Sequence, residues 1–261
     1  NSELRKKTEE TKKILASEKN NSFKDIFQSP VFLLTIIGII GLLIRVYYLP
    51  FELPITHDGS NYFWYTIDMS LLDEFPPGYT FPNNGWPSFL YIFFSLFNSD
   101  DFLDYMNLQR SLSIIISVST IIPVYLLCTR FFKKQYAILG SILFAFEPRL
   151  ILNSTLGISE PLFIMLGTIS LYFFLSKKWM YIYLSFVIAA LYTLVRYEGL
   201  LLIVPLSIIF CDICLASSLD SNNSKLACPI RYSSRYLCIS VPRFEDSTRI
   251  LRASFSPTFF L

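Results

Sequence analysis

The sequence contains six apolar segments of bilayer length, and these segments restrict the folds that the chain can adopt. They occupy residues 30–49, about 108–128, about 135–152, about 160–176, about 179–195 and about 199–214. About 20 helical residues cross the hydrocarbon core of a bilayer. Because a backbone in hydrocarbon must satisfy its own hydrogen bonds, such segments form helices. We therefore expect an all-α fold, a polytopic membrane helical bundle of about six transmembrane helices.

The composition agrees with a chain that resides in a lipid bilayer. Of the 261 residues, 53% are hydrophobic and only 16% are charged, whereas a soluble domain carries roughly a quarter charged residues. The 25 Phe and 16 Tyr residues are typical of spans with aromatic ends. A net charge of +2 does not indicate a nucleic-acid partner, and we expect none.

The distribution of Lys and Arg predicts the orientation of the chain, because cytoplasmic loops carry an excess of these residues. They gather in the N-terminal tail and in the loops after the second and fourth apolar segments: Arg5, Lys6, Lys7, Lys12, Lys13, Lys19, Lys24, Arg130, Lys133, Lys134, Lys177 and Lys178. Residues 50–107 contain neither Lys nor Arg. We predict an integral protein of the plasma membrane or an equivalent membrane, with a cytoplasmic N-terminus.

Residues 50–107 then form a long extracytoplasmic loop between the first and second spans. Inside it the apolar run WPSFLYIFFSLF at 86–97 is too short to cross a bilayer. We expect this run to be an interfacial or re-entrant helix.

Three stretches on the outer side carry unusual polarity. They are THDGSNYFWY at 56–65, FEPRLILNSTLGISEPLF at 146–163 and VRYEGLL at 195–201. The charged residues at the ends of the apolar segments are Glu147, Arg149, Glu160, Arg196 and Glu198. Charges at such depth are costly and mark a functional site or a buried pair, although long side chains also snorkel to the interface.

These residue types suit one kind of chemistry. A carboxylate beside a water-facing cavity can take a proton from a hydroxyl nucleophile, and arginines bind phosphate through paired N–H groups. Aromatic side chains such as Tyr62 can stack on sugar faces or anchor at the interface. The set fits an acceptor hydroxyl, a lipid phosphate and a sugar.

The motifs HDGSNYFW after the first span, SEPLF at the start of the fourth and RYEG before the sixth carry a family resemblance. With this layout the chain resembles the GT-C superfamily of membrane glycosyltransferases, in its protein O-mannosyltransferase-like and lipid A aminoarabinose transferase-like branch. In that superfamily the first span leads into a long outer loop with interfacial helices, and a catalytic acidic residue lies near its start. The resemblance covers about residues 30–214 and places Asp58 at the catalytic position.

The resemblance implies a glycosyltransferase with a polyprenyl-phosphate sugar donor. The acceptor would be a hydroxyl of a protein, lipid or glycan on the extracytoplasmic face, and the anomeric carbon would be inverted. Asp58 is then the expected general base. Arg149 and Arg196 are expected to stabilise the departing lipid phosphate, and Glu160 and Glu198 to orient these arginines or bind the sugar.

Further substrate-binding candidates are His57, Tyr62 and Glu147. His57 is the only histidine, and it is either a substrate contact or ligand or a hydrogen-bonded residue without a chemical role. We expect no cofactor and no metal site. Many relatives have a second acidic residue after the first, but Gly59 follows Asp58 here, so a metal bound by a carboxylate pair is not supported.

We divide the chain into a charged cytoplasmic tail at 1–29, a GT-C-like transmembrane catalytic module at 30–214 and an irregular tail at 215–261. The lack of periodicity in the last part suggests that the module is incomplete, through truncation or an out-of-frame end. A transporter or flippase-like protein is the alternative function, but we see none of the internal repeats that such proteins tend to show. A non-catalytic scaffold is a third reading.

Overall fold

A computed structural model describes residues 29–56, 58–76, 83–176 and 178–219, and within these ranges all regular structure is helical. The expected all-α membrane fold is thereby confirmed. Most of the predicted tails at 1–29 and 215–261, as well as His57, lie outside the described residues.

Two of the long apolar helices lie where the sequence predicts spans. Helix α2 (Pro30–Tyr47) is the first. Helices α5 (Phe102–Ser119) and α6 (Ile121–Cys128) together make an apolar span of 27 residues. This span begins before the predicted start at 108, because Asp101 caps α5 by accepting a hydrogen bond from the Leu103 N–H at 2.8 Å.

The sixth apolar segment is also helical. A 3-10 turn, η1 (Tyr197–Gly199), leads into α11 (Leu200–Leu219). The chain divides into two compact units, Asn1–Ile203 and Val204–Leu261, and the boundary falls within α11. All contacts considered below lie within the first unit.

The third apolar segment is a bent pair of helices instead of the expected continuous helix. Helices α7 (Lys134–Ala145) and α8 (Pro148–Thr155) meet at an angle of 50°. The cause is the sequence FEPR, because proline disfavours the helical conformation in the residue before it, and Glu147 is extended. Pro148 then takes the first position of α8, where its missing N–H costs nothing.

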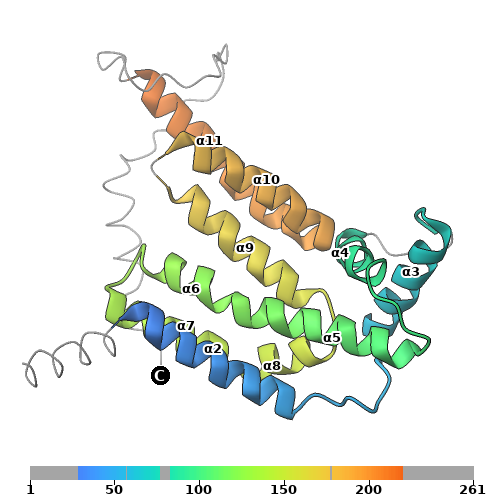
Figure 1. The fold of residues 1–261 in the computed structure, drawn as a ribbon. Helices are drawn as coiled ribbons and strands as arrows, with labels where there is room; N and C mark the ends of the chain where they lie inside the picture. Colours follow the sequence, from blue (N-terminus) through green and yellow to red (C-terminus); the bar gives the residue numbers. More distant parts are fainter. Residues whose placement is uncertain (1–28, 57, 77–82, 177, 220–261) are drawn as a thin grey trace, which may run out of the picture. The chain divides into compact units, whose positions relative to one another are not determined.

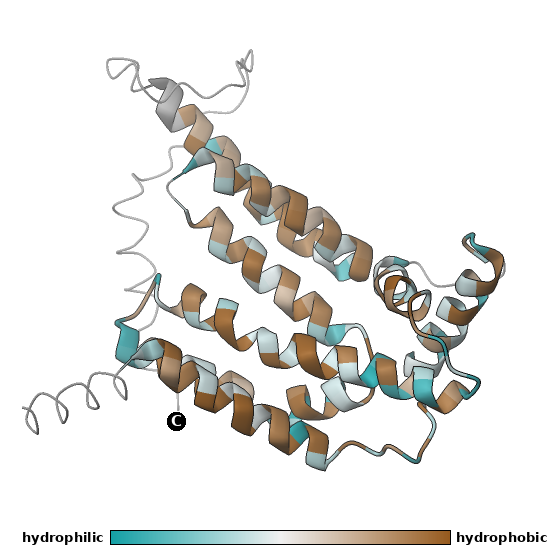
Figure 2. Ribbon diagram, in the orientation of Figure 1, coloured by the Kyte–Doolittle hydropathy of each residue, from teal (hydrophilic) through white to brown (hydrophobic). Residues whose placement is uncertain are grey.

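The fourth and fifth segments form α9 (Glu160–Phe174) and α10 (Trp179–Val195), which are apolar but have only 15 and 17 residues. In the part of the chain that the structure describes, three helices are long and apolar enough to cross a membrane, or four if the bent pair is one span. Figure 2 shows the predominance of hydrophobic residues along these helices. The described helices thus support fewer full-length spans than the six predicted.

Two helices occupy the predicted outer loop, α3 (Asp58–Leu72) and α4 (Gly85–Phe94). The short helix expected at 86–97 is therefore present. The two helices pack against each other, as Figure 1 shows beside the start of α5. Phe63, Trp86 and Leu90 are completely buried and share one apolar cluster with residues of α5, α9 and α10. Helices α3 and α4 are thus part of the core of the first unit.

Arg45 of α2 is completely buried beside the bend between α7 and α8. Its Nη1 donates to the carbonyl oxygens of Gly41 at 3.0 Å and Ala145 at 3.2 Å. Its Nε donates to Ser154 Oγ at 3.2 Å and its Nη2 to Ser117 Oγ at 3.1 Å. Ala145 ends α7, so the guanidinium lies at the negative end of that helix. Arg45 therefore binds α2, α5, α7 and α8 together without a carboxylate partner among the described residues.

We predict that Arg45→Met lowers the free energy of unfolding by roughly 2–5 kcal/mol, because it leaves buried acceptors without their donors. Thermal unfolding of the purified chain in detergent measures this change. The control is Arg130→Met, which removes an exposed arginine above the Tyr172 ring and should cost no more than about 1 kcal/mol. Equal stability of the Arg45→Met and wild-type proteins would contradict the prediction.

Candidate functional site

An arginine and two glutamates meet where α10 ends and α9 begins. Arg196 Nη1 donates to Glu160 Oε1 at 2.6 Å, while its Nη2 and Nε donate to the two oxygens of Glu198 at 2.9 and 3.3 Å. The hydrogen bond to Glu198 raises the pKa of Arg196 above its usual value, and the charge of Glu160 adds to this effect against the opposing effect of burial, so the guanidinium stays charged. Three of the residues singled out in the sequence thus come together in one cluster, which we call the Arg196 cluster.

Local sequence explains this geometry. Arg196 has an extended backbone, which turns its side chain out of the helical path just before η1. Glu160 and Pro161 open α9, where proline and an acidic residue are both favourable. Below the cluster, the rings of Phe163 and Tyr192 stack at 3.9 Å, and the guanidinium lies 5.7 Å from the centre of the Phe163 ring. This stacked aromatic pair joins α9 to α10 beside the Arg196 cluster.

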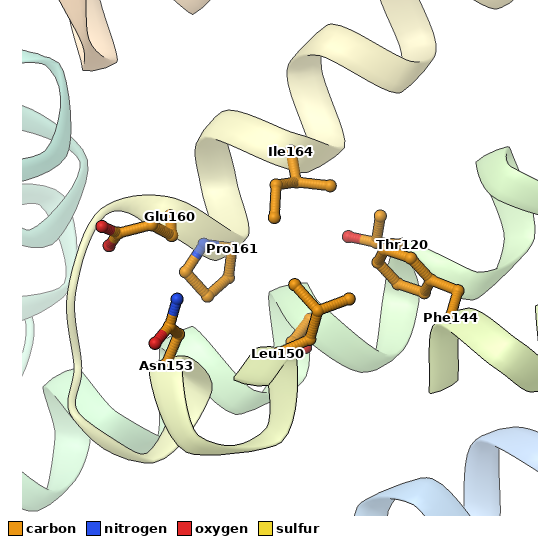
Figure 3. A pocket seen from close by; sticks show the side chains of 8 residues that line it. Thr120, Phe144, Leu150, Asn153, Glu160, Pro161 and Ile164 are labelled. Atoms are coloured by element: carbon orange, nitrogen blue, oxygen red, sulfur yellow. The ribbon is translucent and has the colours of Figure 1, made fainter. Parts of the chain in front are cut away.

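The second oxygen of Glu160, Oε2, is buried and has no hydrogen-bond partner among the described residues. Glu160 also lines a small cavity between α5, α7, α8 and α9 (Figure 3). Its other lining residues are Ser117, Thr120, Phe144, Leu150, Asn153, Pro161 and Ile164. In Figure 3 the Asn153 side chain points toward the start of α9. The cavity volume of about 10 Å³ suits roughly one water molecule, so it is not a sugar-binding site as it stands.

Asp58 is the first residue of α3, and its side chain is exposed. Close packing at the next residue, Gly59, determines where Asp58 lies. A Cβ atom on Gly59 would lie 2.5 Å from Ile55 Cγ2 and 2.6 Å from the carbonyl oxygen of Leu156. Only glycine permits so close an approach, so the start of α3 packs directly on the turn between α8 and α9. Asp58 is thereby placed next to the turn that leads into Glu160.

Tyr62, one turn along α3, makes a second contact with the same region. Its hydroxyl lies 3.5 Å from Ser159 Oγ, and Ser159 is the buried residue just before Glu160. Residues from the first and second polar stretches of the sequence therefore lie together.

Glu147 and Arg149 lie at the bend between α7 and α8. Both side chains are exposed, and within the described residues neither makes an ion pair. Arg149 lies four residues before Asn153 and hence on the same face of α8. Among the described residues, no ion pair joins either of them to the Arg196 cluster.

Buried polar residues inside the apolar segments were not among the residues predicted from the sequence. Gln109 donates from Nε2 to the carbonyl oxygens of Gly59 at 3.0 Å and Gly157 at 2.7 Å. Arg110 donates to the carbonyl oxygens of Pro50 and Leu53, at 2.8 and 2.7 Å. Polar residues within a span are functional or structural by default. The presence of Arg45, Gln109 and Arg110 in apolar segments could therefore have identified them from the sequence.

The fold and the site define a polytopic integral membrane protein with charged groups gathered where its apolar helices begin and end. The chain belongs to the dolichyl-phosphate-mannose-protein mannosyltransferase family, whose family model matches residues 86–232, more than half of the chain. It is therefore a membrane glycosyltransferase of the GT-C type, as the resemblance predicted. No curated protein and no solved structure shows significant similarity to the chain.

The matched residues include the Arg196 cluster as well as Glu147 and Arg149, whereas Asp58 and Tyr62 lie before them. Across the described ranges, no three side chains of His, Cys, Asp or Glu gather closely enough to hold a metal ion. The expectation that the protein needs no cofactor stays a prediction.

We predict that Gly59→Ala destabilises the protein by about 1–3 kcal/mol, because the added methyl group forces a packed backbone apart. The matched control is Gly38→Ala in α2, where the new Cβ would meet only Val118 Cγ1 at an ordinary 3.8 Å. That variant should be neutral or stabilising by up to about 1 kcal/mol, since alanine favours helix. Thermal unfolding of both variants in detergent tests the close approach, and equal stabilities would contradict it.

Proposed function

We propose that the chain transfers a sugar from a polyprenyl-phosphate-linked donor to a hydroxyl acceptor on the extracytoplasmic face of the membrane. The family match carries this proposal, and the Arg196 cluster lies within the matched residues. The family description favours mannose on dolichyl phosphate as the donor and a protein as the acceptor. Lipid and glycan hydroxyls are the alternative acceptors.

In the proposed reaction, the acceptor oxygen attacks the anomeric carbon from the face opposite the phosphate. The new carbon–oxygen bond forms as the bond to the phosphate breaks, and the polyprenyl phosphate leaves with the electron pair. Asp58 accepts the hydroxyl proton. Its exposed carboxylate at the start of α3 is accessible to an acceptor, and Gly59 holds it beside the turn leading to Glu160.

The charges around Arg196 and Arg149 favour a different role for each arginine. Arg196 already binds two carboxylates, and one guanidinium with two carboxylates has a formal charge of −1, which disfavours an anionic phosphate. We assign Arg196 the role of orienting Glu160 and Glu198 toward sugar hydroxyls. Arg149 is exposed and has no acidic partner in the described ranges, so it is our candidate for the lipid phosphate.

We predict that Asp58→Asn lowers the rate of sugar transfer about 10²–10⁴-fold, because the amide cannot accept the proton. The assay uses the purified full chain in liposomes, with labelled dolichyl-phosphate mannose and a serine- and threonine-rich peptide. The control is Glu52→Gln, which neutralises another exposed carboxylate before α3 and should leave transfer unchanged. Full activity of Asp58→Asn would contradict the assignment.

The same liposomes separate the transferase from the flippase-like alternative. A transferase attaches label to the peptide. A flippase moves the donor between leaflets and leaves the peptide unlabelled. Donor movement without peptide, lipid or glycan labelling would favour the alternative.

We predict that Arg149→Gln raises the donor KM about tenfold or more, since a charge-assisted bond to phosphate contributes roughly 1.5–3 kcal/mol. The KM for the acceptor should change little. Arg130→Gln, near the other end of the helices, is the matched control and should leave both values unchanged. An unaltered donor KM in Arg149→Gln would remove this residue from the phosphate site.

A further inference from the structure

We propose that Gln109 is a positioning residue that holds the candidate base Asp58 at a fixed position relative to Glu160. The catalytic part of this inference rests on the function proposed above. Gln109 lies on α5 and is completely buried. Its side chain touches neither Asp58 nor Glu160 in any hydrogen bond of the described residues, so it acts through the backbone beside them.

The Gln109 amide nitrogen has two hydrogens, and both are used. One is donated to the carbonyl oxygen of Gly59 at 3.0 Å and the other to that of Gly157 at 2.7 Å. The reverse orientation would set the amide oxygen against two carbonyl oxygens, so the side chain has only one favourable orientation. A single nitrogen atom thus fixes the separation of these two carbonyl groups.

The two carbonyl groups flank the proposed site. Gly59 directly follows Asp58, and Gly157 lies three residues before Glu160 in the turn between α8 and α9. Gly157 has a left-handed backbone, with φ of 69°, which glycine adopts without strain. Gln109 therefore links the residue next to the candidate base to the turn that leads into the Arg196 cluster.

The Gly157 carbonyl oxygen also accepts a hydrogen bond from Trp86 Nε1 of α4, at 3.2 Å. Its two lone pairs are then both occupied. Trp86 is completely buried. Helices α3 and α4 are therefore both tied to this turn, α4 through Trp86 and α3 through Gln109.

The backbone segments that Gln109 joins are closely packed. A Cβ atom on Gly157 would lie 3.2 Å from Gln109 Cγ, and one on Gly59 would lie 2.6 Å from the Leu156 carbonyl oxygen. The backbones of α3 and the turn are thus in direct contact at the point where Gln109 bonds to both. A change in the length or donor capacity of the side chain at 109 must shift one of them.

The test compares Gln109→Met with Ser113→Ala. Methionine keeps the length of glutamine but donates no hydrogen bond. Ser113 is equally buried one turn along α5, and its hydroxyl has no partner among the described residues. We expect Gln109→Met to lower kcat about 10–100-fold with little change in donor KM, as for a misplaced reacting group. Ser113→Ala should keep both constants.

A second measurement reports the position of α3 without catalysis. Tyr62 and Ser159, whose side chains approach to 3.5 Å, are replaced by cysteine in a full chain whose five native cysteines are serine. A short bis-thiosulfonate reagent should cross-link the pair. Adding Gln109→Met should abolish the cross-link, whereas adding Ser113→Ala should preserve it.

The two readouts separate the possible failures. An unchanged kcat in Gln109→Met, or a loss of kcat that Ser113→Ala reproduces, overturns the positioning role. A cross-link that persists in Gln109→Met also overturns it. A wild-type chain that transfers sugar to no acceptor overturns the proposed function, while loss of the cross-link in Gln109→Met would still support the anchoring of α3 by Gln109.

Discussion

Carbonyl oxygens that helices leave unpaired at their ends are the constraint on which this structure depends. In a bilayer such groups have no water to bind, and each must find a donor within the protein. The chain supplies these donors from buried side chains. Arg45 donates to the last carbonyl group of α7, Arg110 to the carbonyl groups of Pro50 and Leu53 in the segment after α2, and Gln109 and Trp86 to the turn after α8. These interruptions in the helical chain thereby become points where separate helices are joined.

The proposed site follows from these joints. The bend between α7 and α8 allows the chain to turn back into α9 at Glu160, where Arg196 binds it from the end of α10. The start of α3 reaches the same turn because Gly59 has no side chain. Helix α4 approaches equally closely at Gly85, where a Cβ atom would lie 2.6 Å from the backbone of Leu194 and Val195, just before Arg196. Helices α3 and α4 thus pack closely against the segments that lead to Glu160 and Arg196.

Much of this arrangement could be predicted from the sequence. Hydrophobic runs predicted the helices, and the short run at 86–97 predicted α4, because burial in lipid leaves helix as the available structure. The meeting of Glu160, Arg196 and Glu198 followed from placing their segments on one side of the membrane. Periodicity could not reveal the bend before Pro148 in an otherwise apolar run. It also could not reveal the long-range partners of Gln109 and Arg45, which are backbone carbonyl groups of residues 48 to 100 positions away. Such partners depend on how the helices pack.

The most direct measurement of the central claim is photocrosslinking of the purified chain with a polyprenyl-phosphate sugar that carries the photoreactive group on the sugar. Mass spectrometry of the labelled peptides then locates the donor. A donor bound between the start of α3 and the Arg196 cluster will label peptides that contain residues 58–62, 156–160 or 196–198. Label confined to the end of α6 and the start of α7, around residues 130–134, would contradict the account.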